Sequence, residues 1–60
     1  MADILLYGLD EGGQIVFTEQ LAAAERPRLR AIAEARLGRC AAVEVWDGQI
    51  CVVRLRRPDA

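Results

Sequence analysis

The sequence predicts an α+β fold, in which two β-hairpins form a four-stranded antiparallel sheet and one helix packs on one face of it. Asp47-Gly48, between two apolar-rich runs, is a strong hairpin signal. An acidic, glycine-rich stretch from Asp10 to Gly13 separates another pair of such runs and indicates a second turn. Between the hairpins, apolar residues recur at spacings of three and four, which indicates a helix.

The 60 residues are enough for a single small domain, 1–60. We expect its elements in the order ββαββ. Their expected bounds are about 3–9, 14–19, 40–46 and 49–56 for the strands, about 26–37 for the helix, and 58–60 for a frayed tail. The strand order 2-1-3-4 keeps every neighbouring pair antiparallel, whereas the first strand beside the last would put a parallel pair at the centre of the sheet.

In the first hairpin, the turn from Asp10 to Gly13 would pair Leu9 with Gln14. Side chains alternate between the two faces of a strand, so the face toward the helix would carry Ile4, Leu6, Ile15 and Phe17. The opposite face would carry Leu5, Tyr7, Leu9 and Val16. Gly8 inside the first strand indicates a bulge or a close approach by a neighbouring group.

The helix is expected to follow a connector over residues 20–25. Its apolar stripe consists of Leu29, Ile32, Ala33 and Leu37. Pro27 is harmless in a first helical turn but disrupts a helix interior, so the alternative is one long helix from Glu19 that is kinked at Pro27. Gly38 lies where a helix-ending glycine is favoured.

In the second hairpin, Asp47-Gly48 suits a type I′ turn, in which both central residues have positive φ. That turn would pair Val45 with Ile50 and Val43 with Val52. The face toward the helix would then carry Ala41, Val43, Val45, Ile50 and Val52.

The residue types that are missing restrict the chemistry. The chain contains no His, Ser, Lys or Asn, so a histidine base and a serine or lysine nucleophile are excluded. Two cysteines cannot fill a tetrahedral metal shell. We therefore expect no enzyme activity, no metal and no cofactor.

Cys40 and Cys51 are expected on different strands, roughly 13 Å apart at about 3.3 Å per residue, which is too far for a disulfide within one chain. Two reduced thiols are typical of a cytoplasmic protein. No targeting segment and no membrane-spanning run is visible, so we expect a cytoplasmic location and no membrane contact.

The sheet has more apolar residues than one helix can cover. The face away from the helix would hold Leu5, Tyr7, Leu9, Val16, Trp46, Cys51, Val53 and Leu55. Because soluble monomers rarely expose apolar patches of this extent, we expect these residues to be a homodimer interface. The two copies would pack sheet on sheet or continue the sheet across an edge. The alternatives are a monomer whose rear face is screened by Arg and Glu stems, and a different protein partner on the same face.

All eight basic residues are arginines, the residue type suited to bidentate phosphate contacts. The candidate nucleic-acid contacts are Arg28, Arg54, Arg56 and Arg57. Nine acidic residues are dispersed among the arginines and the net charge is −1, so a solvated charged surface is the favoured interpretation and nucleic-acid binding the alternative.

Three stretches carry a family resemblance: Asp10 to Gly13 with Ile15-Val16, Ala31 to Arg36, and Val43 to Gly48 with Val52. In these the chain resembles a set of short bacterial proteins of unknown function that share an Asp/Gly hairpin, an Ala/Arg-rich helix and a last hairpin with Val-Glu-Val/Leu-Trp-x-Gly. The resemblance implies the ββαββ layout and a bacterial protein, and it transfers no catalytic or binding residue. Pro27 departs from the pattern and leaves the start of the helix open.

These observations predict a non-enzymatic, self-associating structural or adaptor module that acts through its apolar sheet face. The alternative is a small nucleic-acid-associated regulator that uses the arginines of the helix and the last strand.

Overall fold

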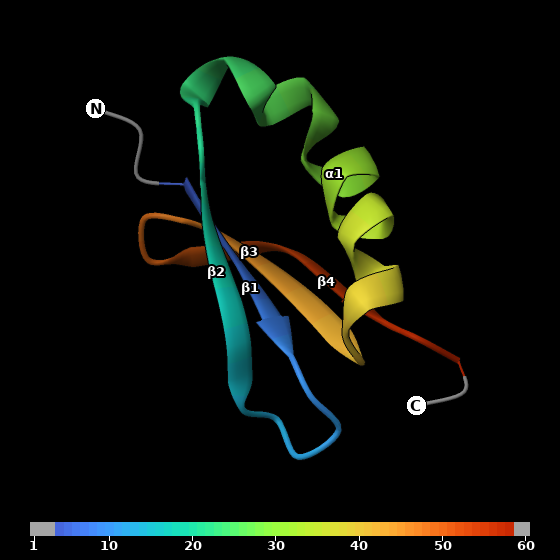
Figure 1. The fold of residues 1–60 in the computed structure, drawn as a ribbon. Helices are drawn as coiled ribbons and strands as arrows, with labels where there is room; N and C mark the ends of the chain where they lie inside the picture. The colour runs from blue at the N-terminus through green and yellow to red at the C-terminus, as the bar shows by residue number, and fades with distance from the viewer. Residues whose placement is uncertain (1–3, 59–60) are drawn as a thin grey trace.

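Four strands form one antiparallel sheet in the order β2-β1-β3-β4 (Figure 1). The computed structural model describes residues 4–58. The strands are β1 (Ile4–Leu9), β2 (Ile15–Leu21), β3 (Ala42–Asp47) and β4 (Ile50–Arg56). Both the strand order and the ββαββ layout confirm the predicted fold. The expected start of the first strand at residue 3 and the fraying of residues 59–60 lie outside the described residues.

A helical segment of three consecutive parts connects the hairpins. It consists of η1 (Ala23–Arg28), α1 (Leu29–Arg36) and η2 (Leu37–Arg39). The expected connector over 20–25 is therefore wrong, because β2 continues to Leu21 and helical turns begin at Ala23, ahead of Pro27. The first of these turns is 3₁₀ rather than α, and Pro27 lies within it. After Pro27, η1 continues through Arg28, and α1 begins at Leu29.

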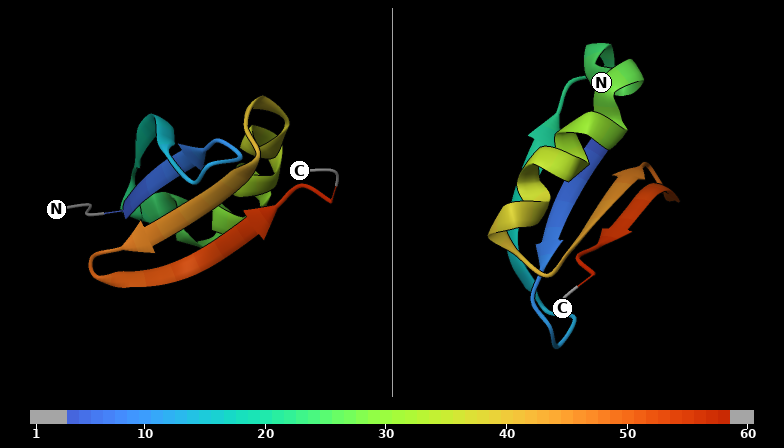
Figure 2. Two further views of the ribbon diagram at one scale, coloured as in Figure 1. Left: turned by 90° about the horizontal axis from the view of Figure 1, so that it is seen from below. Right: turned by 90° about the vertical axis from the view of Figure 1, so that its right-hand side faces the viewer.

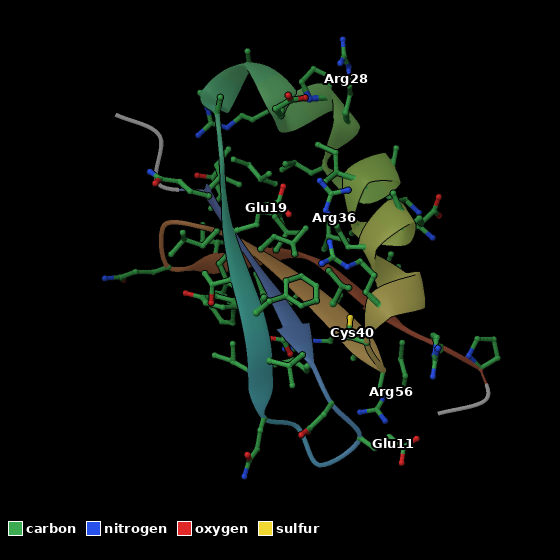
Figure 3. The ribbon with its side chains drawn as sticks, viewed as in Figure 1. Glu11, Glu19, Arg28, Arg36, Cys40 and Arg56 are labelled. Carbon is green, nitrogen blue, oxygen red and sulfur yellow. The ribbon has the colours of Figure 1, made fainter. Side chains whose placement is uncertain are left out.

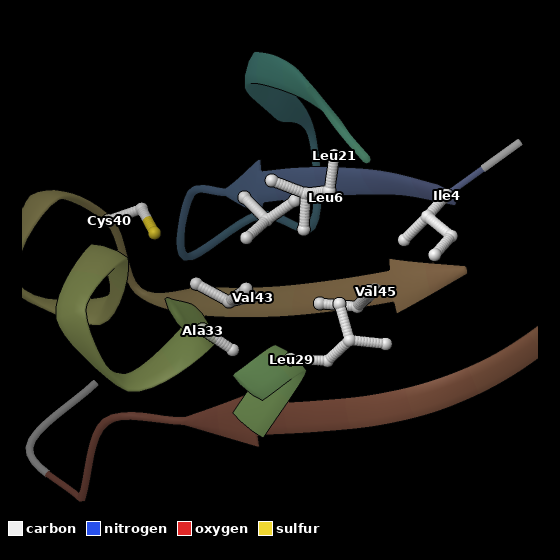
Figure 4. Packing of buried hydrophobic residues seen from close by; sticks show 8 residues of the cluster. All are labelled: Ile4, Leu6, Leu21, Leu29, Ala33, Cys40, Val43 and Val45. Atoms are coloured by element: carbon white, nitrogen blue, oxygen red, sulfur yellow. The ribbon is translucent and has the colours of Figure 1, made fainter. Parts of the chain in front are cut away.

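The helical segment lies on one side of the sheet, and the other side has no covering element among the described residues (Figure 2). The core is the layer between sheet and helix. Ile4, Leu6, Val43 and Val45 are fully buried in it, and each such side chain contributes about 1.5–3 kcal/mol relative to an exposed one. Figure 4 shows them with the remaining buried residues of the cluster, Leu21, Leu29, Ala33 and Cys40.

Two bidentate ion pairs hold the helical segment over the sheet. Arg36 donates from Nε and Nη2 to the two carboxylate oxygens of Glu19, both at 2.8 Å. Arg26 donates in the same way to Asp47, both at 3.0 Å. Because Glu19 belongs to edge strand β2 and Asp47 to the end of β3, the pairs connect the segment to two separate parts of the sheet.

The first hairpin differs from the predicted register. Asp10 Oδ1 accepts hydrogen bonds from the backbone N–H groups of Gly12 and Gln14, both at 2.9 Å, so the loop extends through Gln14. Leu9 pairs with Ile15 instead of Gln14, and a bulge follows, because Gly8 pairs with Phe17. Ile15 was expected in the core but is 57% exposed.

The second hairpin also differs from its prediction. Asp47 pairs with Ile50, so the central turn residues are Gly48 and Gln49. Gly48 has a φ of 66° while no described non-glycine residue has a positive φ, which matches a II′ turn and rules out the expected I′ turn. A bulge at Val52 then adds one residue to β4, so that Val45 pairs with Val53.

An added residue reverses the faces of the rest of a strand, because side chains alternate with a period of two. Val53 and Leu55 therefore pack against the core on the helix side, although they were expected on the opposite face. Ile50 and Val52, expected in the core, are 67% and 45% exposed.

Candidate functional site: the open face of the sheet

The open face is the side of the sheet that points away from the helical segment. The cross-strand partners arrange its side chains in three rows. Written from β2 to β4, the rows are Gln20-Leu5-Trp46-Cys51, Thr18-Tyr7-Glu44-Arg54 and Ile15-Leu9-Ala42-Arg56.

An apolar strip runs along β1 on the open face. Leu5, Tyr7 and Leu9 follow one another along β1 and are half-buried by their neighbours. Trp46 lies beside Leu5 on β3 and is also half-buried. Ile15 extends this apolar strip to edge strand β2. Aromatic and branched side chains at adjacent cross-strand positions pack on one another, so the strip forms a continuous surface.

Glu44 is the one acidic side chain within the three rows. Its Oε1 accepts a hydrogen bond from the indole Nε1 of Trp46 at 3.1 Å. Its Oε2 lies 3.5 Å from Nε of Arg54. The carboxylate therefore satisfies the indole N–H of Trp46 and is partly neutralised by a neighbouring guanidinium.

The predicted interface residues are divided by the structure. Leu5, Tyr7, Leu9, Trp46 and Cys51 lie on the open face, as expected. Val53 and Leu55 pack against the core, and Val16 is the bulged residue of β2, 53% exposed. Ile15 was not predicted to lie on the open face. The signal for it was Asp10, a residue type whose side chain often accepts hydrogen bonds from a loop backbone, because the longer loop makes Ile15 the partner of Leu9.

The four arginines predicted to contact nucleic acid do not converge. Arg54 and Arg56 lie on the open face along β4. Arg28 belongs to η1, where its Nη1 is 3.8 Å from Oε1 of Glu25. Arg57 follows β4, and its backbone N–H donates to the carbonyl oxygen of Ala41 at 3.0 Å.

A shallow groove of about 370 Å³ lies at the end of the molecule where the first turn meets η2 and the end of β4. Figure 3 shows Glu11, Cys40 and Arg56 at this end. The thiol of Cys40 donates to the carbonyl oxygen of Ala42 at 3.1 Å, and both cysteines are free thiols. The Cys40 thiol is therefore buried and engaged with the backbone.

Comparison with known proteins gives no match. This holds for protein-family models, for curated proteins and for solved structures.

Within residues 4–58, no cluster of three or more Cys, Asp or Glu side chains has the arrangement of a metal site. No helix in this part of the chain has the length and apolar character of a membrane span.

Proposed function

We propose that the chain is a non-enzymatic, self-associating module in which a second copy packs on the open face. The observation that carries this proposal is the apolar strip of Leu5, Tyr7, Leu9, Ile15 and Trp46, which lies on the side of the sheet opposite the only helical segment of the described residues. Trp and Tyr are enriched among the residues that dominate binding energy at protein interfaces.

The size of the open face fits a dimer of modest affinity. Its three strand spacings of about 4.8 Å give a width of about 14 Å between the outer strands. Burial of this face would remove on the order of 500–800 Å² per partner, against about 800 Å² for a standard interface. Because several of the side chains are already half-buried, we expect a dissociation constant in the micromolar range.

Sedimentation velocity from about 1 µM to 500 µM tests the proposal. We expect a reversible monomer–dimer equilibrium for the wild type, and loss of the dimer in Leu5→Lys, which puts a charge in the apolar strip. Ile50→Lys is the matched control, because Ile50 is 67% exposed but lies beyond the three rows. A wild type that stays monomeric over the whole range would contradict the proposal.

A second candidate, single-stranded nucleic-acid binding, is favoured by one observation. Tyr7 and Trp46 share the open face with Arg54 and Arg56, and proteins that bind single strands combine aromatic stacking surfaces with basic side chains. This candidate is weaker because Glu44 lies at the middle of the face and already pairs with Arg54. A carboxylate there would repel the phosphate backbone.

Fluorescence of Trp46 separates the two candidates. Titration of a short single-stranded oligonucleotide at low salt would quench the indole if bases stack on it. We would then expect Arg54→Gln with Arg56→Gln to abolish the quenching. No quenching, together with flow-through on heparin at low salt, would eliminate the second candidate.

A further inference from the structure

We propose that two copies pack face to face about a twofold axis parallel to the strands, so that β1 of each copy lies over β3 of the other. This arrangement rests on the proposed function and specifies the geometry of the partner at the same site. Two features of the structure favour it: the bulged edges of the sheet, and the positions of Glu44 and Arg54.

The sheet edges are poorly suited to pairing with another copy. β2 and β4 are the edge strands, and each contains a bulge, at Val16 and at Val52. A bulge interrupts the row of outward backbone groups and twists the edge away, which is a known protection against edge-to-edge association. The open face is therefore a better surface for a second copy than either edge.

An axis parallel to the strands keeps each row opposite itself and reverses the order of the strands. Leu5 then lies over the partner's Trp46, and Leu9 over the partner's Ala42. Tyr7 lies over the partner's Glu44, where the phenol can donate to the carboxylate. Arg54 meets the partner's Thr18, so no like charges face each other across the interface. The angle of about 30° between packed sheets leaves these pairs within reach of long side chains.

An axis in the plane of the sheet but perpendicular to the strands keeps the strands opposite themselves and exchanges the first and third rows. The middle row would then face itself. Glu44 would lie over the partner's Glu44, and Arg54 over the partner's Arg54. Like charges in contact across an interface cost several kcal/mol, so the charges of the middle row favour the axis parallel to the strands.

Thr18 offers a direct test, because its side chain is exposed. β1 and β3 separate it from Arg54 within one copy by about 14 Å. Thr18→Glu should face the partner's Arg54 and tighten the dimer about three- to tenfold at low salt, with two new ion pairs per dimer. Thr18→Lys should weaken it by a similar factor. Both changes should shrink at about 0.5 M salt.

Sedimentation equilibrium of the three proteins gives distinct outcomes. A dimer that tightens with Glu and weakens with Lys supports the axis parallel to the strands. A dimer that weakens with both residues would mean that position 18 faces itself, and this geometry would be wrong. A dimer that neither residue affects would also overturn it, since position 18 would lie outside the interface. A wild type that is monomeric instead removes the proposed function itself.

A crosslink provides a second measurement that does not depend on affinity. Gln20 and Cys51 are the two ends of the first row, and the proposed axis puts Gln20 over the partner's Cys51. In Gln20→Cys, a bis-maleimide that spans about 10 Å, the spacing of packed sheets, should produce covalent dimers. The wild type and Gln20→Cys with Cys51→Ala should not. Absence of dimers from Gln20→Cys would count against the geometry.

Discussion

Gly8 shows how a single residue determines the helix side of the sheet. A Cβ at this position would overlap the ring of Phe17, which pairs with Gly8 across β1 and β2. The guanidinium of Arg39 lies 5.3 Å from the centroid of that ring, in the range of a cation–π contact. The missing side chain therefore allows an aromatic residue of an edge strand to reach the core.

Gly8→Ala should destabilise the protein by about 1–3 kcal/mol, because the added methyl group displaces the Phe17 ring. Urea unfolding followed by Trp46 fluorescence measures this difference. Gly38→Ala is the control, since a Cβ there meets no atom within 4 Å. We expect the control to be as stable as the wild type or slightly more stable. Equal stability of both variants would contradict the packing described for Gly8.

The ion pairs of the helical segment make stability depend on pH. The hydrogen bonds from Arg36 lower the pKa of Glu19 from its ordinary value of 4.5, more than burial raises it, and the charges of Arg36 and Arg39 add to the effect. Hydrogen bonds from Arg26 lower the pKa of Asp47 in the same way. A lowered folded-state pKa contributes stability that is complete above the unfolded-state pKa and is lost as pH falls through the folded-state pKa.

We therefore expect the melting temperature to fall as pH decreases below about 4.5, the ordinary pKa of Glu19. Arg36→Gln should lower the melting temperature at neutral pH and reduce its dependence on pH in the acidic range. Arg30→Gln, which removes an arginine 3.4 Å from Glu34 on the helix surface, is the control and should leave the acidic profile close to that of the wild type. Thermal unfolding by circular dichroism between about pH 2 and pH 7 makes the comparison.

At the scale of the elements, the two hairpins show how turn and bulge together decide which residues enter the core. In the second hairpin, the II′ turn and the bulge at Val52 present Val53 and Leu55 to the helix. Without the bulge, these residues would point away from α1 and be lost from the core. The packing of Val53 and Leu55 in the core therefore compensates for the interruption of the hydrogen-bonded pairing between β3 and β4.

Alanine substitutions in β4 test this register. Val53→Ala removes two methyl groups that pack on the core and should cost about 1–2 kcal/mol. Val52→Ala changes a side chain that is 45% exposed and should alter stability by no more than about 0.5 kcal/mol. Urea denaturation of the two variants gives the comparison. A larger loss from Val52→Ala than from Val53→Ala would show that the register of this hairpin is different.

At the scale of the whole molecule, the two faces of the sheet differ in how far they are covered from solvent. The helix side has a buried cluster and bidentate ion pairs, whereas the open face has an apolar strip with a polar margin. A chain of 60 residues buries only about 60% of the surface that its unfolded form exposes. Association through the open face would add apolar burial that one copy cannot supply alone.

If the proposed dimer forms, the melting temperature should rise with protein concentration, because association stabilises the folded state by mass action. Differential scanning calorimetry from about 20 µM to 1 mM would detect a shift of several degrees. Leu5→Lys should unfold at a temperature that does not depend on concentration. If the melting temperature of the wild type also did not depend on protein concentration, the proposed dimer would be contradicted.

Part of the candidate site could be predicted from sequence and part could not. Leu5, Tyr7, Leu9 and Trp46 were assigned to the open face correctly, because they lie on the central strands β1 and β3, whose alternation is regular throughout. Every misplaced residue lies on an edge strand: Ile15 and Val16 on β2, and Ile50, Val52, Val53 and Leu55 on β4. The edge strands are where the bulges occur.

The sequence by itself determined the order of the elements, the antiparallel sheet and the apolar stripe of the helix, since turn residues and hydrophobic periodicity are local signals. The tertiary structure alone decided which residues of the edge strands face the core. Each of the two edge strands contains a bulge, at Val16 and at Val52, and a bulge inserts one residue into the strand. Because the period of a strand is two, that one residue exchanges the buried and the exposed faces.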